Sequence, residues 1–359
     1  MVKINIAYFI TGHGFGHGTR SAAVIEQLVQ LDPLIDLHIY TDLPAFLLRQ
    51  SISHPFELHV GPVDFGLVQH SAVSVNIDQS IKQLEDRFES LMRDHEKIAL
   101  ELKKNQINAV VSDISPLGIL AAQAANIPSF LVSNFTWDWI YQGLAVLDRR
   151  FISWADRFGQ IYEDCDFRFE CTPHCNTVAP DSLLVGPVAR QTRVSPAEIR
   201  RQLGVQANQK LVFLTLGGWV GHPLVVAPSD DFFVVAAGQT DQEVPGENRL
   251  QIPWESRFFH PDLVQAADLL ICKLGYSTVA EAYLGGTAVL YLARHDFPES
   301  PKLAAFVEGQ MLASEVTEEQ LTSGHWVQLY RTLSQPHSLE TIPVAGARQI
   351  ADTIIKTLQ

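Results

Sequence analysis

Basic side chains are scarce in this sequence of 359 residues. Lys and Arg number 26 against 40 Asp and Glu, which gives a formal net charge of −14 at pH 7. Nucleic acids and anionic membranes are bound mainly through clustered Lys and Arg, so non-specific binding to either is not expected. Small anionic ligands are still compatible with this charge, because backbone N–H groups at helix N-termini can hold a phosphate without a basic surface.

Long apolar runs are missing as well. No run reaches the roughly 18 residues that a membrane-spanning helix needs. The opening segment MVKINIAYFIT is typical of a buried strand rather than of the apolar core of a signal peptide. We therefore expect a cytoplasmic protein without a transmembrane segment, while peripheral contact with a membrane stays open.

Cysteines are few, and they do not form a metal-binding pattern. The four are Cys165, Cys171, Cys175 and Cys272. Without an export signal they are expected to be reduced thiols. Cys165, Cys171, His174 and Cys175 lie close together along the chain, but C-x₂-C pairs are absent. Packing is therefore favoured over zinc, and no metal site is predicted.

The chain contains enough apolar material, 47% of its residues, for two domains of ordinary size. Buried-strand patterns alternate with helical patterns, which is typical of parallel sheets covered by helices on both faces. The predicted strands are 4–11, 36–40, 109–112, 129–133, 211–216, 232–237, 249–252, 269–273 and 288–292. The predicted helices are 77–105, 117–125, 195–204 and 345–358. Residues 183–194 lack periodicity and are predicted to be a linker. The fold class is therefore α/β, with two Rossmann-like domains.

The segment TGHGFGHGTR at residues 11–20 directly follows the first strand. Its alternating glycines would let the backbone pass close to a ligand. The dinucleotide fingerprint G-x-G-x-x-G fails, because His17 and Thr19 stand where its third glycine is needed, and a P-loop is also absent. Histidine can act as a base near neutral pH and Arg20 can hold an anion. We take His13 as the candidate base; the alternative is that both histidines merely pack the loop.

A second candidate is the segment LLICKLGYSTVAE at residues 269–281. A buried strand leads to Gly275, and a helix then opens at Ser277 and Thr278, whose N-terminal N–H groups suit a diphosphate. Glu281 lies about one turn into that helix and could accept both hydroxyls of a ribose. The alternative is a capping motif in which Glu281 only interacts with the helix dipole.

Two further segments follow strand ends. Polar side chains at 294–301 suggest contacts to a hydroxyl-rich ligand, or else an ordinary loop. Asp113 ends one strand and residues 134–139 end the next, so both are expected to face the same crevice. Asp113 could assist proton transfer. Trp137 and Trp139 could stack on a sugar ring, although a place in the core is at least as well supported.

These segments, in this order and spacing, resemble the two-domain glycosyltransferases of the GT-B fold. More narrowly, they resemble the N-terminal, glycosyltransferase-like half of L-arabinokinases. The resemblance rests on TGHGFGHGTR at 11–20, VVSDISPLG at 110–118, SNFTWDWIY at 133–141, KLGYSTVAEA at 273–282 and ARHDFPESP at 293–301. A wider similarity is to the N-acetylglucosaminyltransferase that makes the lipid-linked peptidoglycan precursor. The kinase motif of L-arabinokinases is not found, so sugar kinase activity is not expected.

The resemblance implies an acceptor-side domain at 1–185, a nucleotide-sugar domain at 186–340, and a helix within 341–359 that crosses back to the first domain. The implied catalytic residues are His13, with His17 and Asp113 as alternatives. The implied donor-binding residues are Gly217, Gly218, Lys273, Gly275, Tyr276, Ser277, Thr278, Glu281, Asp296 and Glu299. The acceptor-side residues are Gly12, Gly14, Gly16, Arg20, Asn134, Trp137 and Asp138.

The expected function is therefore a metal-independent glycosyltransferase, inverting by analogy with the family. It would need no cofactor beyond a nucleotide-diphosphate sugar as cosubstrate, UDP being favoured, and its acceptor is an unknown small or lipid-linked molecule. One alternative is a nucleotide-sugar 2-epimerase. Another is a sugar-nucleotide-binding or regulatory module without turnover, because the segment Trp219–Pro223 leaves little room for the helix that usually follows Gly218.

Overall fold

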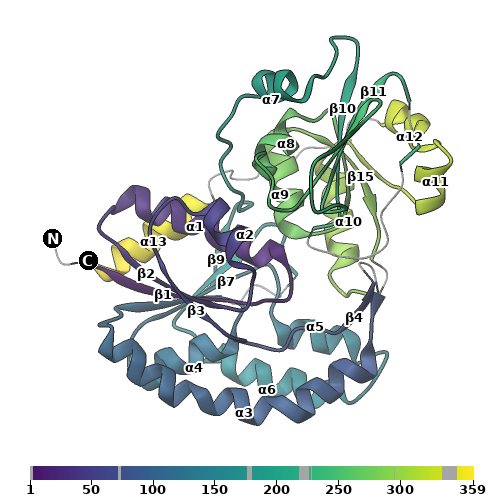
Figure 1. Cartoon of the computed structure of the whole chain (residues 1–359). Helices are drawn as coiled ribbons and strands as arrows, with labels where there is room; N and C mark the ends of the chain where they lie inside the picture. The colour runs from purple at the N-terminus through teal and green to yellow at the C-terminus, as the bar shows by residue number, and fades with distance from the viewer. Residues whose placement is uncertain are drawn as a thin grey trace.

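Two seven-stranded sheets, one in each half of the chain, organise the structure (Figure 1). The computed structural model describes residues 3–71, 74–175, 180–217, 226–227, 229–294, 296–333 and 346–359. In both sheets nearly all neighbouring strands are parallel. The predicted α/β fold class is confirmed.

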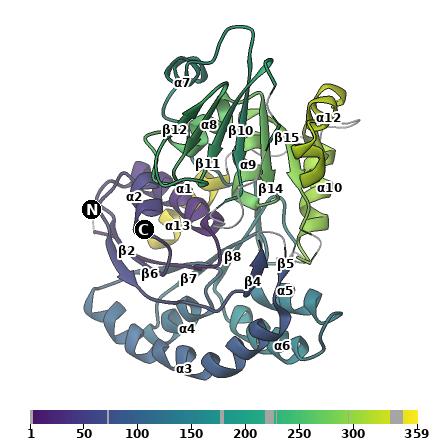
Figure 2. The ribbon, with the colours of Figure 1, turned by 45° about the vertical axis from the view of Figure 1, so that its right-hand side comes forward.

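The first sheet is wholly parallel, and its strands are buried because helices cover both of its faces. In spatial order its strands are β3 (Glu57–Val60), β2 (Asp36–Thr41), β1 (Asn5–Ile10), β6 (Ala109–Asp113), β7 (Ser129–Ser133), β8 (Phe167–Cys171) and β9 (Leu183–Val185). One face is covered by α1 (Phe15–Leu31), α2 (Ala45–Ser51) and α13 (Gly346–Leu358). The other is covered by α3 (Ile77–Lys104), α4 (Pro116–Ala125), α5 (Trp137–Leu144) and α6 (Phe151–Glu163), as Figure 2 shows.

The second sheet repeats this plan with one antiparallel edge. Its order is β12 (Val244–Gly246), β13 (Arg249–Ile252), β11 (Phe232–Ala237), β10 (Lys210–Thr215), β14 (Leu269–Lys273), β15 (Ala288–Leu292) and β16 (Ala313–Glu315), with β12 antiparallel to β13. Helices α7 (Pro196–Leu203), α8 (His260–Ala266), α9 (Tyr276–Gly285) and α10 (Ser300–Gln310) pack on one face. Helices α11 (Glu318–Thr322) and α12 (Trp326–Thr332) pack on the other.

Local sequence signals explain where the helices begin and end. Ser195 caps α7, because its Oγ accepts the N–H of Glu198 at 3.4 Å, and Gly204 ends that helix with a left-handed φ of 74°. Asn76 caps α3 in the same way, accepting the N–H of Gln79 at 3.0 Å. The sequence predicts α7 from its Ser195 cap and its terminal glycine, and α3 from its apolar residues at helical spacing.

The prediction of a linker at 183–194 is wrong at its start. Residues Leu183–Val185 form β9, which pairs with β8 and closes the first sheet. A three-residue edge strand is too short to produce a periodic pattern, so the sequence carries no signal for it. The chain reaches the second unit only after β9.

The last helix belongs to the first unit, although it follows the second unit in sequence. Helix α13 packs along α1, and Ile350 and Ile354 are fully buried in the core beneath that helix. Figure 1 shows the yellow helix beside the purple one. The chain therefore passes between the two units twice.

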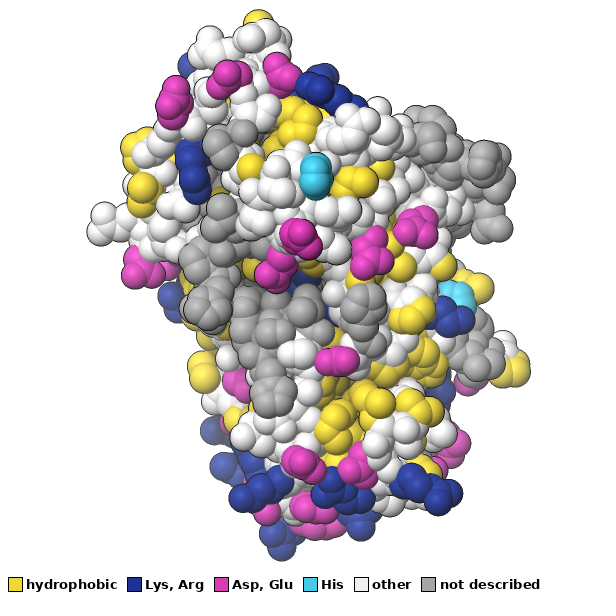
Figure 3. All heavy atoms as spheres, turned by 90° about the vertical axis from the view of Figure 1, so that its right-hand side faces the viewer, with side chains coloured by type: hydrophobic (Ala, Val, Ile, Leu, Met, Phe, Trp, Pro, Cys, Tyr) yellow, Lys and Arg dark blue, Asp and Glu magenta, His cyan; other side chains and the backbone are white. Residues whose placement is uncertain are grey.

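The remaining features of the fold are a short two-stranded hairpin and the distribution of side chains on the surface. A hairpin of β4 (Gln69–Ser71) and β5 (Ser74–Val75) stands beside the first sheet. In the face drawn in Figure 3, acidic and basic side chains are interspersed, and hydrophobic ones gather in the lower half. None of the helices in the described ranges combines the length and apolar character needed to cross a bilayer.

Candidate functional site

A cavity lies between the two units, where β1, β10 and β14 end. In open parallel sheets this edge is where ligands bind. We call it the cationic chamber, because Lys273 and Arg294 are among its walls. Its lining residues are His13, Gly14, Phe15, Gly16, His17, Arg20, Gln69, Phe135, Thr215, Gly217, Lys273, Leu274, Gly275, Tyr276, Ser277, Thr278, Arg294, Glu299 and Leu303.

A second cavity adjoins the first one and shares five of its walls. It is richer in aromatic side chains, and we call it the aromatic chamber. The shared residues are Phe15, Gly16, Gly217, Ser277 and Thr278. The remaining walls are Thr19, Phe46, Leu47, Gln50, Arg190, Trp254, Phe258, Phe259, His260 and Glu281. The two chambers are therefore neighbours separated by five common wall residues.

The loop after β1 is shaped by close packing on one side and by the cavity on the other. A Cβ at Gly12 would lie 1.7 Å from Asp42 Oδ1, so a larger residue there would require the exposed Asp42 side chain to move. A Cβ at Gly14 would meet nothing within 4 Å. Gly14 and Gly16 line the cavity, whereas Gly12 is not among its walls. The predicted approach of this loop to a ligand stays a prediction.

His17 faces the cationic chamber and is held from behind by Asp113. Its Nδ1 lies 2.7 Å from Asp113 Oδ1. Because an ionised carboxylate only accepts hydrogen bonds, Nδ1 carries the proton and Nε2 keeps the lone pair. Burial lowers the pKa of His17, and the bond to Asp113 only partly offsets this. A neutral ring with its free lone pair on Nε2 is the form that a general base needs.

Asp113 is completely buried, yet it stays ionised. Arg20 donates to it twice, from Nε at 2.8 Å and from Nη2 at 2.5 Å, and Ser21 Oγ donates at 3.0 Å. Burial alone would raise the pKa of Asp113, but the charge of Arg20 and the bonds from Arg20 and His17 hold that pKa below its ordinary value. Asp113 does not line the cavity. Its place in the structure is that of a positioning residue for His17.

His13 also faces the chamber, but one of its two ring nitrogens already accepts a hydrogen bond from the backbone. Its Nδ1 accepts the backbone N–H of Leu67 at 3.2 Å, so the ring proton lies on Nε2. That nitrogen is 3.4 Å from the Nε2 of Gln69. Burial lowers the pKa of His13 well below its ordinary value. In this arrangement the only lone pair of His13 is used by the backbone, and the geometry favours His17 as the base.

Two cations reach the cationic chamber from the second unit. No described residue hydrogen-bonds or ion-pairs with the Lys273 ammonium, and burial, followed by the nearby charge of Arg294, lowers the pKa of Lys273 to about 7. Arg294 is buried, donates to Glu299 Oε1 at 3.2 Å, and leaves its Nε without a partner among the described residues. The Lys273 ammonium and the buried Arg294 Nε are donors without partners among the described residues, which is typical of an anion-binding site.

The N-terminus of α9 faces the same chamber. Gly275 is the N-cap residue, and the first turn contains Tyr276, Ser277 and Thr278. Ser277 Oγ donates to the Gly16 carbonyl of the first unit at 2.6 Å, so the two units touch at this point. Tyr276 is fixed by a 2.8 Å contact between its hydroxyl and Cys175 Sγ. The first turn of α9 and Lys273 thus line one cavity, and the binding of a diphosphate there stays a prediction.

Glu281 lines the aromatic chamber, although its carboxylate already has partners. Arg190 Nε donates to Oε1 at 2.9 Å, and His260 Nδ1 lies 3.0 Å from Oε2. Burial would raise the pKa of Glu281, but the charge of Arg190 and the contacts with His260 lower it overall. Each carboxylate oxygen has a second lone pair, so the predicted bond to ribose hydroxyls stays a prediction.

The predicted acceptor-side residues beyond the loop lie behind the cavity rather than in it. Asn134 holds Arg20 and donates to the carbonyl groups of Cys171 and Pro173, both at 2.8 Å. Trp137 is buried and donates to Asp64 at 2.9 Å, with its ring against the edge of His13. Asp138 is half-buried and is not among the walls of either chamber. These side chains support the loop, and the core position of Trp137 replaces the sugar-stacking alternative.

One predicted donor residue is not described, and another lies outside the chamber. Gly218 lies outside the described residues, as does the segment Trp219–Pro223. Asp296 is exposed and is not part of either cavity wall, because the loop turns inward only at the buried Phe297 and Glu299. Gly217, with a φ of 59°, lines both chambers and lies beneath the side chain of Lys273.

Sequence reasoning missed several residues of the site. Arg294 lies in the candidate segment 294–301 but is not among the predicted donor-binding residues. Its sequence signal is its place just after a strand end, five residues before Glu299. Gln69 comes from the short hairpin, and Trp254 packs on Gly238, which adopts a positive φ of 77°. Neither residue has a sequence signal, because tertiary contacts alone bring them to the site.

Comparisons with known proteins place this geometry in context. No protein-family model matches the chain. The L-arabinokinase of Arabidopsis thaliana is 29% identical over 333 residues, which are 89% of this chain and 31% of that protein. The chain therefore spans about a third of the length of this curated relative.

Solved structures resemble the whole chain. UGT89C1 of Arabidopsis thaliana, complexed with UDP, has a TM-score of 0.59 and 13% identity, covering 99% of this chain and 100% of that one. A UDP-glucosyltransferase of Polygonum tinctorium reaches 0.62 with 12% identity and covers 99% of both chains. A UDP-N-acetylglucosamine 2-epimerase of Listeria monocytogenes reaches 0.60 with 12% identity, covering 99% and 95%. The chain therefore has the two-domain α/β fold of the GT-B glycosyltransferases.

Proposed function

We propose that this protein is a glycosyltransferase that takes its sugar from a nucleotide-diphosphate donor. One observation carries the proposal: His17, backed by Asp113, and the cations Lys273 and Arg294 face the same cavity from opposite units. A base for an acceptor hydroxyl and charges for a leaving diphosphate are the two requirements of glycosyl transfer. We propose no cofactor beyond the donor.

The donor would lie across both chambers. The aromatic chamber suits a nucleoside, because Trp254 and Phe258 offer apolar faces and Glu281 offers acceptor oxygens for ribose hydroxyls. The diphosphate would lie at the N-terminus of α9, within reach of Lys273. UDP is the preferred nucleotide in this proposal, since similar structures are named for UDP or UDP-sugars.

The chemical step follows from this placement. His17 Nε2 takes the proton of the acceptor hydroxyl while that oxygen attacks the anomeric carbon. The bond between the anomeric carbon and the diphosphate breaks, and its electron pair stays on the phosphate oxygen near Lys273. Asp113 stabilises the imidazolium that forms, as a buried carboxylate can when it stays ionised. Attack from the side opposite the diphosphate would invert the anomeric centre.

We further propose that this step needs no metal ion. Lys273, Arg294 and the N-terminus of α9 supply the positive charge that a bridging metal would otherwise supply to the leaving group. Full transferase activity in the presence of a chelator would support this part of the proposal.

Donor binding is tested with Lys273→Met and Arg294→Met. Each is expected to weaken UDP binding by about 10- to 100-fold, because hydrogen bonds to charged groups are lost. Isothermal titration calorimetry measures this directly. Lys302→Met is the control: Lys302 is exposed on α10 and is not part of either chamber wall, so its replacement removes an equal charge and should leave the affinity unchanged. UDP affinity that is equal in all four proteins would contradict the proposed donor site.

The pH dependence of UDP binding is a second prediction. The pKa of Lys273 is about 7, and a bound diphosphate would raise it. Below that pKa the ammonium is already protonated, whereas above it each binding event must take up a proton. We expect the affinity for UDP to fall by up to about tenfold per pH unit above neutrality. The decline should be flatter in Lys273→Met; equal slopes would show that Lys273 is not the titrating group.

A 2-epimerase is the second candidate, because the epimerase structure resembles the chain as closely as the transferases do. An epimerase changes the donor sugar without any acceptor, whereas a transferase releases UDP in proportion to acceptor consumed. A binding module would bind UDP and leave the donor sugar unchanged. Following the donor by NMR with and without acceptor mixtures separates the three outcomes.

A further inference from the structure

Two neighbouring strands of the first sheet bring a second group of functional side chains together, away from the chambers. Strands β2 and β3 are parallel, and their register places His38 opposite Glu57 and Tyr40 opposite His59. Because side chains alternate along a strand, these four side chains share one face of the sheet. This is the face covered by α3, where Tyr40 packs with Ala99 of that helix.

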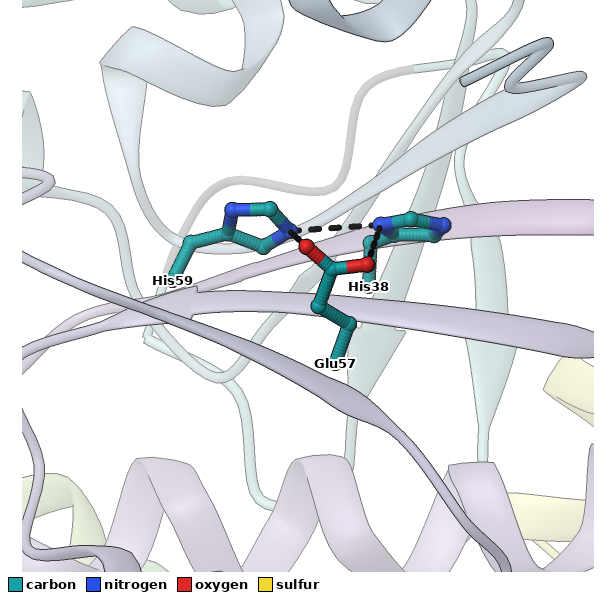
Figure 4. A group of neighbouring side chains, drawn as sticks. All are labelled: His38, Glu57 and His59. Carbon is teal, nitrogen blue, oxygen red and sulfur yellow. Dashed lines mark hydrogen bonds and ion pairs between the residues drawn. The ribbon is translucent and has the colours of Figure 1, made fainter.

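The three polar members of this group point at one another. His38 Nδ1 and His59 Nε2 lie 3.2 Å apart. Glu57 spans the two rings, with Oε2 at 3.6 Å from His38 Nδ1 and Oε1 at 3.5 Å from His59 Nε2. Figure 4 shows both ring nitrogens facing each other above the Glu57 carboxylate. Among the described His, Cys, Asp and Glu side chains, this is the group of three whose ligand atoms converge, all within 4.8 Å.

These separations match those of a metal's ligands. Atoms bound tetrahedrally to zinc at 2.0–2.1 Å lie about 3.3–3.4 Å from one another. The two ring nitrogens, 3.2 Å apart, are close to that value, and each lies 3.5 or 3.6 Å from a different oxygen of the Glu57 carboxylate. Two imidazole nitrogens and one carboxylate are also a common donor set for zinc, and three protein ligands leave a coordination position for water.

The rings are held in this orientation by stacking. His59 lies on Tyr40 with ring centroids 4.1 Å apart and planes 5° apart. Tyr40 in turn lies on Phe9 at 4.5 Å and 2°. His38 is buried, His59 is mostly buried, and the Glu57 side chain is 63% exposed. The histidines are therefore preorganised, while the carboxylate side is open for an ion to enter.

We propose that His38, Glu57 and His59 form a binding site for a divalent transition metal of the zinc class. The site joins β2 to β3, which is the edge strand of the sheet. Unpaired edge strands are the least protected part of a sheet. A metal there would fasten β3 to the sheet independently of any ligand in the chambers. Sequence patterns of close Cys and His pairs give no sign of it, because only Glu57 and His59 are near neighbours along the chain.

The test is calorimetric titration of chelator-treated protein with Zn²⁺ at neutral pH. Wild type is expected to bind a single ion, and His59→Gln and Glu57→Gln to bind it at least about 100-fold more weakly. His54→Gln is the matched control, because His54 lies outside the group, where its Nε2 donates to the Ile35 carbonyl at 2.8 Å. It should bind zinc like wild type. Circular dichroism and UDP affinity show whether each variant is folded.

A second readout is independent of affinity. Co²⁺ bound in a tetrahedral site gives strong visible absorption bands, which should appear in wild type and His54→Gln but not in His59→Gln. Zinc should also raise the melting temperature of wild type more than that of His59→Gln. If wild type and His59→Gln bind zinc equally, or if neither binds it, the group is a hydrogen-bonded His–His–Glu cluster only and the proposal is overturned.

Discussion

Replacing His17 with Gln is expected to lower the kcat of glycosyl transfer by about 10²- to 10⁴-fold, the usual contribution of a positioned general base. The affinity for UDP should change little, because His17 approaches the chamber from the unit opposite Lys273 and the N-terminus of α9. Steady-state kinetics and UDP titration of the same preparation measure the two effects. A loss in kcat without a loss in donor affinity is the signature of a base acting on the acceptor.

The matched control is His13→Gln. A glutamine oxygen can still accept the Leu67 N–H that His13 Nδ1 accepts now, so the loop should keep its shape and kcat should fall far less. The pH profile adds a readout that a packing role would not change: the acidic limb, set by protonation of His17, should be missing in His17→Gln. If instead His13→Gln is the inactive variant, the assignment of the base returns to the sequence-based choice.

Replacing Arg20 with Met is expected to lower the free energy of unfolding by about 3–5 kcal/mol, because it leaves a buried carboxylate unpaired. Arg20 and Asp113 are both almost inaccessible, at 4% and 0% side-chain exposure. The change also removes the hydrogen bond that Arg20 Nη1 donates to Asn134 Oδ1. Chemical denaturation followed by tryptophan fluorescence and by circular dichroism measures the loss.

Two comparisons separate this effect from the mere loss of an arginine. Arg150→Met breaks ion pairs with Asp78 and Asp148 at the surface and should hardly change stability, since exposed pairs contribute little. The double variant Arg20→Met with Asp113→Leu removes both charges, and it should recover much of the stability. A double variant no more stable than Arg20→Met would mean that shape, rather than unpaired charge, accounts for the loss.

The sequence predicts the buried framework well, because long apolar strands between turn residues have a clear pattern. The predicted strands 129–133, 232–237, 249–252, 269–273 and 288–292 coincide with β7, β11, β13, β14 and β15. The short strands β3, β9 and β12 were missed, since three or four partly exposed residues give no periodic signal. The candidate loops after β1, β14 and β15 do meet at one cavity, because the carboxyl ends of the parallel strands of each sheet border the space between the two units.

What the sequence could not supply is the direction of each side chain within those loops. His13 and His17 are separated by three residues and have the same chemistry, yet one bonds to the Leu67 backbone and the other to Asp113. That difference depends on the path of the loop and on Gly66, whose φ of 61° brings it against the His13 ring. The role of Asp113 likewise needs the structure, which shows that it bonds to His17 Nδ1 and is itself held by Arg20.

The return of α13 to the first unit has a consequence for how the molecule can be handled. The second unit is in effect an insertion, since both ends of the described chain belong to the first unit (Figure 1). A label or tag joined to either end would therefore sit beside the first unit and leave the second unobstructed. The second unit is also joined to the first at two points of the chain rather than at one, so a single cut in either crossing would leave the two units covalently connected.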